Sequence, residues 1–115
     1  MGTELDGRVA VVTGASGNLG PVWSEALRAA GATVVGIDLR PGDGVEEADV
    51  TDPEALRAAL ERIAGAHGVP SVLVNNAGID QPPDPAAGGE ESLDAFRRTL
   101  EVNLAGTFNA TTVFG

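Results

Sequence analysis

Short apolar runs alternate along the chain with stretches in which apolar residues recur every three or four positions. Residues 8–13, 33–37 and 71–74 are rich in Val, Ile and Leu and end at turn-forming residues, which predicts three buried strands. A weaker run over residues 45–50 predicts a short additional strand. Strands that alternate with helices indicate the α/β class, with a parallel sheet and right-handed crossovers.

Three segments between and after these strands have helical spacing. The first begins after Gly20, has Pro21 in its first turn and ends at Gly31. The second begins at residues 51–54, Thr-Asp-Pro-Glu, which combine a cap residue, a first-turn proline and a capping-box glutamate. The third covers residues 92–113. The apolar positions are Val22, Trp23, Ala26, Leu27 and Ala30 in the first helix, Leu56, Leu60 and Ile63 in the second, and Phe96, Leu100, Leu104 and Phe108 in the third.

Composition narrows the possible functions. The chain has 115 residues, of which 43% are hydrophobic and 21% charged, and these values fit one globular domain. Its net charge of -10, with no Lys, argues against a nucleic-acid partner. The absence of Cys excludes disulfides and thiolate metal sites, and we expect no metal site. Without a leader-like segment or an apolar run of membrane length, the chain is expected to be cytoplasmic, with no membrane partner. Pro, Gly and Ala accumulate over residues 80–89, which predicts an exposed, mobile loop.

A glycine-rich turn, Thr-Gly-Ala-Ser-Gly-Asn-Leu-Gly at residues 13–20, joins the first strand to the first helix. Small residues there let backbone amides approach a pyrophosphate lying over the helix N-terminus. Gly14 would permit the sharp exit from the strand, and Gly20 would let helix and sheet pack closely. Turns between strands and helices are often glycine-rich in any case, so the turn alone is weak evidence. We expect cofactor contacts from Gly14, Ser16, Gly17, Asn18, Leu19 and Gly20.

An acidic residue, Asp38, stands at the end of the second strand, with Leu39 after it. A carboxylate at this position can accept both ribose hydroxyls of an adenosine group, and it would repel a 2′-phosphate. NAD is therefore favoured as the cofactor over NADP, although Arg40 two residues later keeps NADP open. The alternative is that Asp38 is a solvated turn residue paired with Arg40.

Five motifs together resemble the short-chain dehydrogenase/reductase family, whose order and spacing they follow over nearly the whole chain. They are TGASGNLG at 13–20, Asp38, ADVTD at 48–52, NNAG at 75–78 and EVNLAGTF at 101–108. The resemblance implies an incomplete Rossmann-like domain over residues 1–115, a doubly wound parallel sheet with strand order 3-2-1-4. It also implies hydride transfer between NAD and an alcohol or ketone. Asn18 replaces the middle glycine of the family's turn, and Asn is the residue best able, after Gly, to adopt a positive φ.

The resemblance gives roles to residues that would otherwise be neutral. Asp49 and Val50 look like the pair that brackets adenine, although by sequence alone Asp49 is simply a residue at a helix entry. Residues 76–78, Asn76, Ala77 and Gly78, look like the turn that passes the adenosine ribose, with Asn75 tying neighbouring strands together. Without the family, this segment is a turn after a strand.

Asn103 matches the asparagine of the family's Asn-Ser-Tyr-Lys catalytic tetrad. In the family a Tyr is the general acid/base, and a nearby Lys lowers its pKa. This chain contains no Tyr and no Lys and ends at Gly115, so we expect it to be catalytically inactive alone. It would be the NAD-binding portion of an oxidoreductase or, alternatively, a non-catalytic NAD-binding or assembly module. The unpaired fourth strand and the uncovered last helix predict self-association.

Overall fold

The computed structural model describes residues 3–78 and 89–114. The loop predicted over residues 80–89 lies outside the described residues except for Gly89, which begins the next helix. No helix within the described residues is long and apolar enough to cross a membrane. The described part also contains no group of three or more His, Cys, Asp or Glu side chains placed to hold a metal ion.

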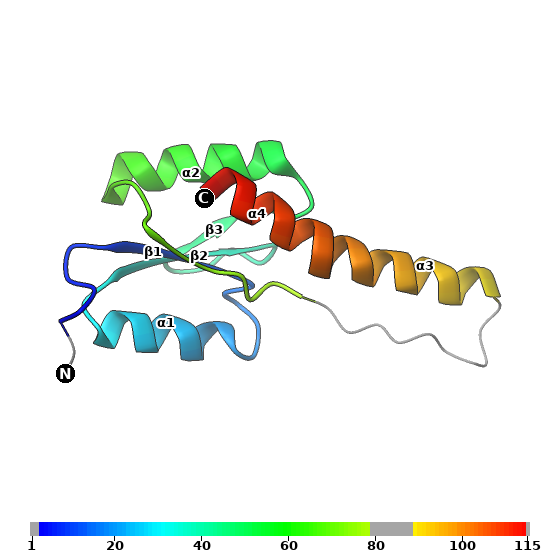
Figure 1. Ribbon diagram of the computed structural model, residues 1–115, viewed down its shortest axis with the longest axis horizontal. Helices are drawn as coiled ribbons and strands as arrows, with labels where there is room; N and C mark the ends of the chain where they lie inside the picture. Colours follow the sequence, from blue (N-terminus) through cyan, green and yellow to red (C-terminus); the bar gives the residue numbers. More distant parts are fainter. Residues whose placement is uncertain (1–2, 79–88, 115) are drawn as a thin grey trace.

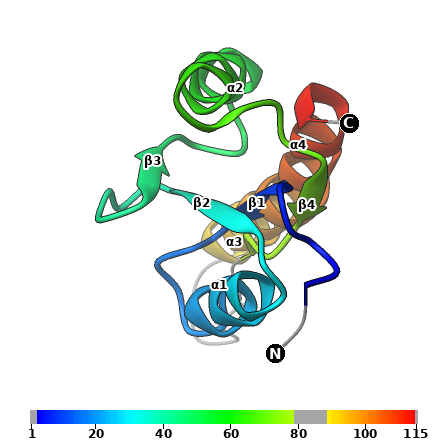
Figure 2. The same cartoon turned by 90° about the vertical axis from the view of Figure 1, so that its left-hand side faces the viewer.

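Four parallel strands form one sheet, as the apolar runs predict. They are β1 (Val9–Thr13), β2 (Thr33–Asp38), β3 (Val45–Glu47) and β4 (Val72–Val74). Their order across the sheet is β3-β2-β1-β4, which confirms the predicted order and is visible in Figure 2. Every residue of β1 is buried, because this strand lies between β2 and β4. The carboxyl ends of β1, β2 and β4 therefore meet at one edge of the sheet.

Helices cover both faces of the sheet (Figure 1). Helix α1 (Gly20–Ala29) packs on one face, and α2 (Pro53–His67) and α4 (Gly106–Phe114) pack on the other. Alternate side chains of β1 serve the two faces: Val9 and Val11 join the core under α2 and α4, while Ala10 and Val12 join the core under α1. This is a doubly wound arrangement, and the α/β class predicted from the sequence is confirmed.

Helix α1 is rotated relative to the face that its apolar residues suggest. Val22 and Trp23 are 59% and 45% exposed, whereas Ser24 is buried. A Cβ on Gly20 would lie 2.4 Å from the carbonyl oxygen of Ala15, so the start of the helix is held tightly against the turn before it. That contact turns positions 20, 24 and 27 toward the sheet, and Ser24 is small enough to fit there.

The last helix is not a uniform α-helix. It begins as α3 (Gly89–Leu100), passes through one π-helical turn, η1 (Glu101–Ala105), and continues as α4. The backbone N–H of Gly106 donates to the carbonyl oxygen of Glu101, five residues back. A Cβ on Gly106 would lie 2.6 Å from Cγ2 of Val50, so only glycine allows this close approach. The π-helical turn lies directly before this close contact, and such turns are frequent at functional sites.

Candidate functional site

The glycine-rich turn leaves β1 sharply at Gly14, which has a φ of 65°. A Cβ at this position would lie 2.8 Å from the Cα of Ala77, in the turn that follows β4. Glycine is thus required at residue 14 both by the backbone conformation and by the closeness of the second turn. The sequence predicts that Gly20 lets the helix pack closely on the sheet. Gly20 does make a close approach, but its contact is with the carbonyl of Ala15 in the turn before the helix.

Asn18 does not occupy the conformation that its similarity to glycine suggested. No residue other than glycine has a positive φ within residues 3–78 and 89–114, so the expectation of a positive φ at Asn18 is wrong. The left-handed conformation of this turn is taken by Gly14 alone. Asn18 is exposed and lies in the turn without backbone strain. The turn therefore accepts Asn in place of glycine without using the ability of Asn to adopt a positive φ.

The N-terminus of α1 is open toward this turn. Leu19 is the N-cap, and its side chain cannot accept a hydrogen bond from the first amides of the helix. The first turn contains no acidic residue and has a proline, Pro21. The first amides of a helix carry a partial positive charge, and an anion is the partner that they favour.

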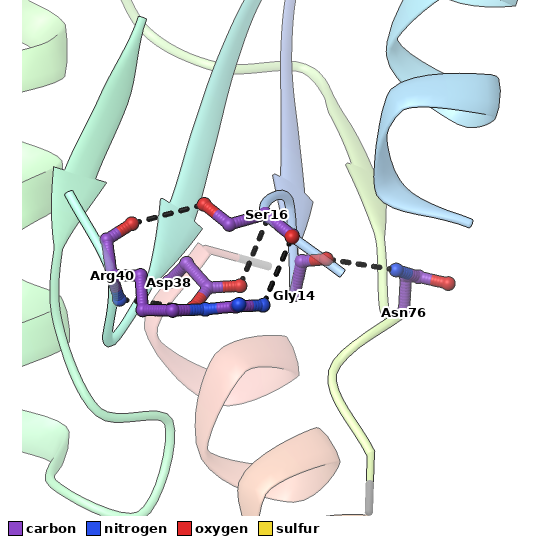
Figure 3. Close-up of polar contacts among 5 residues, drawn as sticks. All are labelled: Gly14, Ser16, Asp38, Arg40 and Asn76. Atoms are coloured by element: carbon purple, nitrogen blue, oxygen red, sulfur yellow. Dashed lines mark hydrogen bonds and ion pairs between the residues drawn. The ribbon is translucent and has the colours of Figure 1, made fainter. Parts of the chain in front are cut away.

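Asp38 and Arg40 hold the turn against the end of β2 (Figure 3). The backbone N–H of Ser16 donates to Asp38 Oδ2 at 3.0 Å, and that of Arg40 donates to Asp38 Oδ1 at 3.0 Å. The Arg40 guanidinium donates to the carbonyl of Ser16 at 2.9 Å, while the Ser16 hydroxyl donates to the carbonyl of Arg40 at 2.9 Å. An ionised carboxylate accepts about four hydrogen bonds, so Asp38 keeps capacity for further donors.

The ion pair between Asp38 and Arg40 is a weak one. Arg40 Nε lies 3.9 Å from Asp38 Oδ1, and the Arg40 side chain is 72% exposed. Exposed pairs of this kind contribute about 0–1 kcal/mol. The Asp38 side chain is only 13% exposed, and its position is fixed mainly by the two backbone donors. The predicted pairing of Asp38 with Arg40 is present, and Asp38 at the same time faces the neighbouring pocket.

The turn after β4 is fastened directly to the glycine-rich turn. Thr13 Oγ1, which is buried, accepts from the backbone N–H groups of Asn76 and Ala77 at 3.1 and 3.0 Å. The Asn76 side chain donates to the carbonyl of Gly14 at 3.2 Å (Figure 3). The Asn75 side chain instead donates to Thr111 Oγ1 of α4, so the expectation that Asn75 ties the strands together is wrong. Thr13 and Asn76 make that link.

A pocket of about 130 Å³ opens where these elements meet. Seven of the predicted cofactor-binding residues line it: Gly14, Asp38, Leu39, Asp49, Val50, Ala77 and Gly78. Ile37, Ala48, Arg98 and Val102 also line it and were not predicted. Ala48 adjoins the predicted pair Asp49 and Val50, whereas Arg98 and Val102 come from α3 and η1, distant in the sequence. Ser16, Gly17, Asn18, Leu19, Gly20 and Asn76 do not line it; the first five belong to the glycine-rich turn and Asn76 to the turn after β4.

Asp49 combines a structural contact with a place in the pocket. Its Oδ1 accepts from the backbone N–H of Thr51 at 2.9 Å and from the Thr51 hydroxyl at 2.7 Å. These bonds shape the entry to α2, as the sequence alone suggests. The cap of that helix, however, is Asp52, and Asp49 faces the pocket beside Val50.

Asn103 lies in the π-helical turn η1 and is exposed. A Cβ on Gly78 would lie 3.2 Å from Asn103 Oδ1, so Asn103 adjoins the turn after β4. Its backbone carbonyl accepts from the Thr107 hydroxyl at 2.9 Å. The structure thus brings Asn103 to the edge of the site, in a chain whose sequence has no Tyr and no Lys.

The parallel sheet, the helices on both faces and the glycine-rich turn at its carboxyl edge define a Rossmann-like α/β protein. A family model described as short chain dehydrogenase matches residues 8–114. The chain therefore belongs to the short-chain dehydrogenase family.

Individual relatives agree with this assignment. The chain is 38% identical, over 92% of its length, to a cis-4-hydroxycyclohexanecarboxylate dehydrogenase of Sinomonas cyclohexanicum, of which it covers 47%. It is 33% identical, over 91% of its length, to a D-threitol dehydrogenase of Mycolicibacterium smegmatis, of which it covers 45%. A ligand-free aldohexose dehydrogenase of Thermoplasma acidophilum superposes on 98% of the chain with a TM-score of 0.82 and 30% identity, and 45% of that structure is covered. The chain thus spans about half the length of these relatives.

Proposed function

We propose that the chain binds NAD(H) and forms the cofactor-binding half of an alcohol or ketone oxidoreductase. One observation carries this proposal: the glycine-rich turn leads from Gly14 and the Asp38 carboxylate, which both line one pocket, to the uncapped N-terminus of α1. Glycine at residue 14 lets the turn after β4 pack directly against the glycine-rich turn, which brings residues 76–78 beside the site. The residues present therefore fit a dinucleotide.

Different parts of the site would bind different groups of the cofactor. Backbone amides of residues 14–20 would hold the pyrophosphate at the helix N-terminus. Asp38 would accept from the adenosine ribose, and Asp49 and Val50 would meet the adenine. The turn formed by residues 76–78 would lie alongside the adenosine ribose. When bound, the nicotinamide would supply the hydride chemistry of the family.

We propose that NAD is bound in preference to NADP. The Asp38 carboxylate is a negative charge at the place where a 2′-phosphate would arrive. Calorimetry should show NAD bound about tenfold or more tightly than NADP, a difference of about 1.4 kcal/mol. Asp38→Ala should narrow that difference, whereas Asp43→Ala, which removes the same charge from the exposed turn after β2, should leave it unchanged. Equal affinity of the unmodified chain for both cofactors would contradict the assignment.

We further propose that this 115-residue chain has no dehydrogenase activity by itself. Positioned acid–base groups contribute about 10²–10⁴-fold to such reactions, and the chain has neither the Tyr nor the Lys that the family uses. The two relatives named above are dehydrogenases of hydroxy compounds, which supports alcohol or ketone chemistry for the whole protein. NADH formation over a panel of alcohols should stay at background. Robust turnover would contradict this proposal and leave cofactor binding intact.

The partner proposed for this chain is a second copy of itself. Leu104 and Phe108 are 67% and 68% exposed on the last helix, and β4 is an edge strand of the described sheet. Exposed apolar side chains beside an unpaired strand favour association, and ordinary salt would screen the repulsion from a net charge of -10. Light scattering should show oligomers. A clean monomer at tens of micromolar would contradict the proposal.

A further inference from the structure

The cationic side chain of the pocket comes from an unexpected part of the chain. Of the described residues that line the pocket, Arg98 alone is cationic. It lies in the last turn of α3, and Val102, which also lines the pocket and is buried, follows four residues later. This spacing places both residues on one side of the helix. In Figure 1 this helix runs past the end of the sheet.

The neighbouring arginine has a different environment. Arg97 pairs with Asp94 at 3.9 Å, with both side chains mostly exposed, and it does not line the pocket. Both residues are exposed arginines on the same helix, so they differ mainly in the side of the helix on which they lie. Arg97 is therefore a matched control for any role of Arg98.

The remaining lining identifies the group that Arg98 would meet. Ile37, Val50 and Val102 give apolar walls. Asp38 and Asp49 give two carboxylates. A purine base has apolar faces and a polar edge, which suits such a pocket. A planar guanidinium stacks on an aromatic face and also offsets nearby carboxylates. Residues 16–20 of the glycine-rich turn do not line this pocket, whereas Gly14 at its start does. Asp49 and Val50, the pair expected to bracket the adenine, line the pocket together with Arg98.

We infer that Arg98 is a base-recognition residue that stacks its guanidinium on the adenine of the bound dinucleotide. The inference rests on the proposed function, because it assigns a residue to the adenine end of the same site. It adds a contact from α3 to those expected from Asp49 and Val50. Arg98 lies in α3, just before the EVNLAGTF motif at residues 101–108.

The test measures the affinity of four chains, unmodified, Arg98→Ala, Arg98→Lys and Arg97→Ala, for ADP-ribose and for adenosine. Arg98→Ala should weaken both ligands about three- to tenfold, as expected for the loss of a cation stacked on a ring. Arg98→Lys should bind at an intermediate level, because it keeps the charge and loses the planar group. Arg97→Ala should stay within about twofold of the unmodified chain, since exposed pairs contribute little. Circular dichroism of all four chains checks the fold.

The outcomes separate this inference from the proposed function. If the unmodified chain binds neither ligand, the proposed function fails. If it binds and Arg98→Ala matches Arg97→Ala, only the role of Arg98 is overturned. A different result would be that Arg98→Ala weakens the affinity for ADP-ribose but not for adenosine, or weakens it only at low salt. Either result would place Arg98 against phosphate and overturn base recognition. A loss that persists at high salt supports stacking.

Discussion

The two helices that follow β1 and β3 begin in opposite ways. Both have a proline in the first turn, at Pro21 in α1 and Pro53 in α2. In α2, Asp52 Oδ1 accepts from the backbone N–H groups of Glu54 and Ala55 at 3.1 and 3.3 Å, and Glu54 adds an acid to the first turn. In α1 the N-cap makes no side-chain bond, and the first turn has no acid.

The two helices treat the same physical problem differently. The first amides of every helix lack partners within the helix. At α2 the chain supplies its own acceptor and charge, so this N-terminus needs no ligand. At α1 the same amides are left to solvent or to an anion, and the glycine-rich turn keeps side chains out of the way. The chain therefore forgoes a cap of about 1 kcal/mol at the helix proposed to hold the cofactor.

The largest effect is expected from Gly14→Val, which would place a side chain where the glycine-rich turn packs against the turn after β4. The substitution puts a β-branched residue at a φ of 65° and a Cβ 2.8 Å from the Cα of Ala77. We expect unfolding in urea to become easier by about 2–5 kcal/mol, from backbone strain and overpacking together. Nucleotide binding should be lost as well. Gly42→Ala is the control, because a Cβ there meets nothing within 4 Å.

Near-native stability of Gly14→Val would contradict the close approach of the two turns. It would mean that the turn after β4 can move away at little cost, although Thr13 and Asn76 fasten it. If Gly14→Val lost nucleotide binding but kept its stability, the new side chain would be interfering with the ligand and not with the packing of the two turns.

A second change would give α1 the kind of start that α2 has. Leu19→Asp puts an acceptor and a negative charge at the N-cap, where Leu19 is 59% exposed and contributes little to the core. NAD affinity should fall about tenfold or more, because the carboxylate would compete with and repel the pyrophosphate. The melting temperature should stay level or rise. Leu19→Ala, which removes the apolar side chain without adding charge, should bind as the unmodified chain does.

Opening α2 is the reverse change and should affect stability alone. Asp52→Ala removes the acceptor for two backbone amides, at a cost of about 1 kcal/mol measured by urea unfolding. NAD affinity should not change, because Asp52 does not line the pocket. Asp52→Asn should restore most of the stability, since Asn is an equally good cap. A matching fall in NAD affinity would show that the two helix starts are coupled.

Much of this comparison could be predicted from the sequence. Residues 51–54 predict a capped helix, and residues 13–20 predict a turn whose backbone amides are accessible at a helix N-terminus. Both predictions depend on local chemistry. The apolar runs likewise predict the four strands, because a buried strand must be apolar wherever it lies. The strand order followed from the family resemblance and not from the apolar pattern.

What could not be predicted depends on contacts between distant segments. The π-helical turn η1 adjoins the close approach of Gly106 to Val50, which no local pattern encodes. Ser24 is buried in place of Trp23 because the fixed start of α1 sets its rotation. Arg98 reaches the pocket only through the path of α3. Each case needs tertiary geometry in addition to periodicity.

The smallest effect is expected at Asn18, inside the open turn. Because its φ is not positive, glycine would relieve no strain there and would only increase the freedom of the unfolded chain. Asn18→Gly should therefore destabilise the chain by about 0.5–1 kcal/mol in urea unfolding. NAD affinity should be unchanged, since the backbone amides stay in place. Gly65→Ala in α2 is a control in which glycine is removed and not added. A Cβ there meets nothing within 4 Å, so this substitution should stabilise the helix by a similar amount. A stabilising Asn18→Gly would show that the turn adopts a positive φ at this residue in solution, and the two helix starts would then differ in backbone conformation as well as in capping.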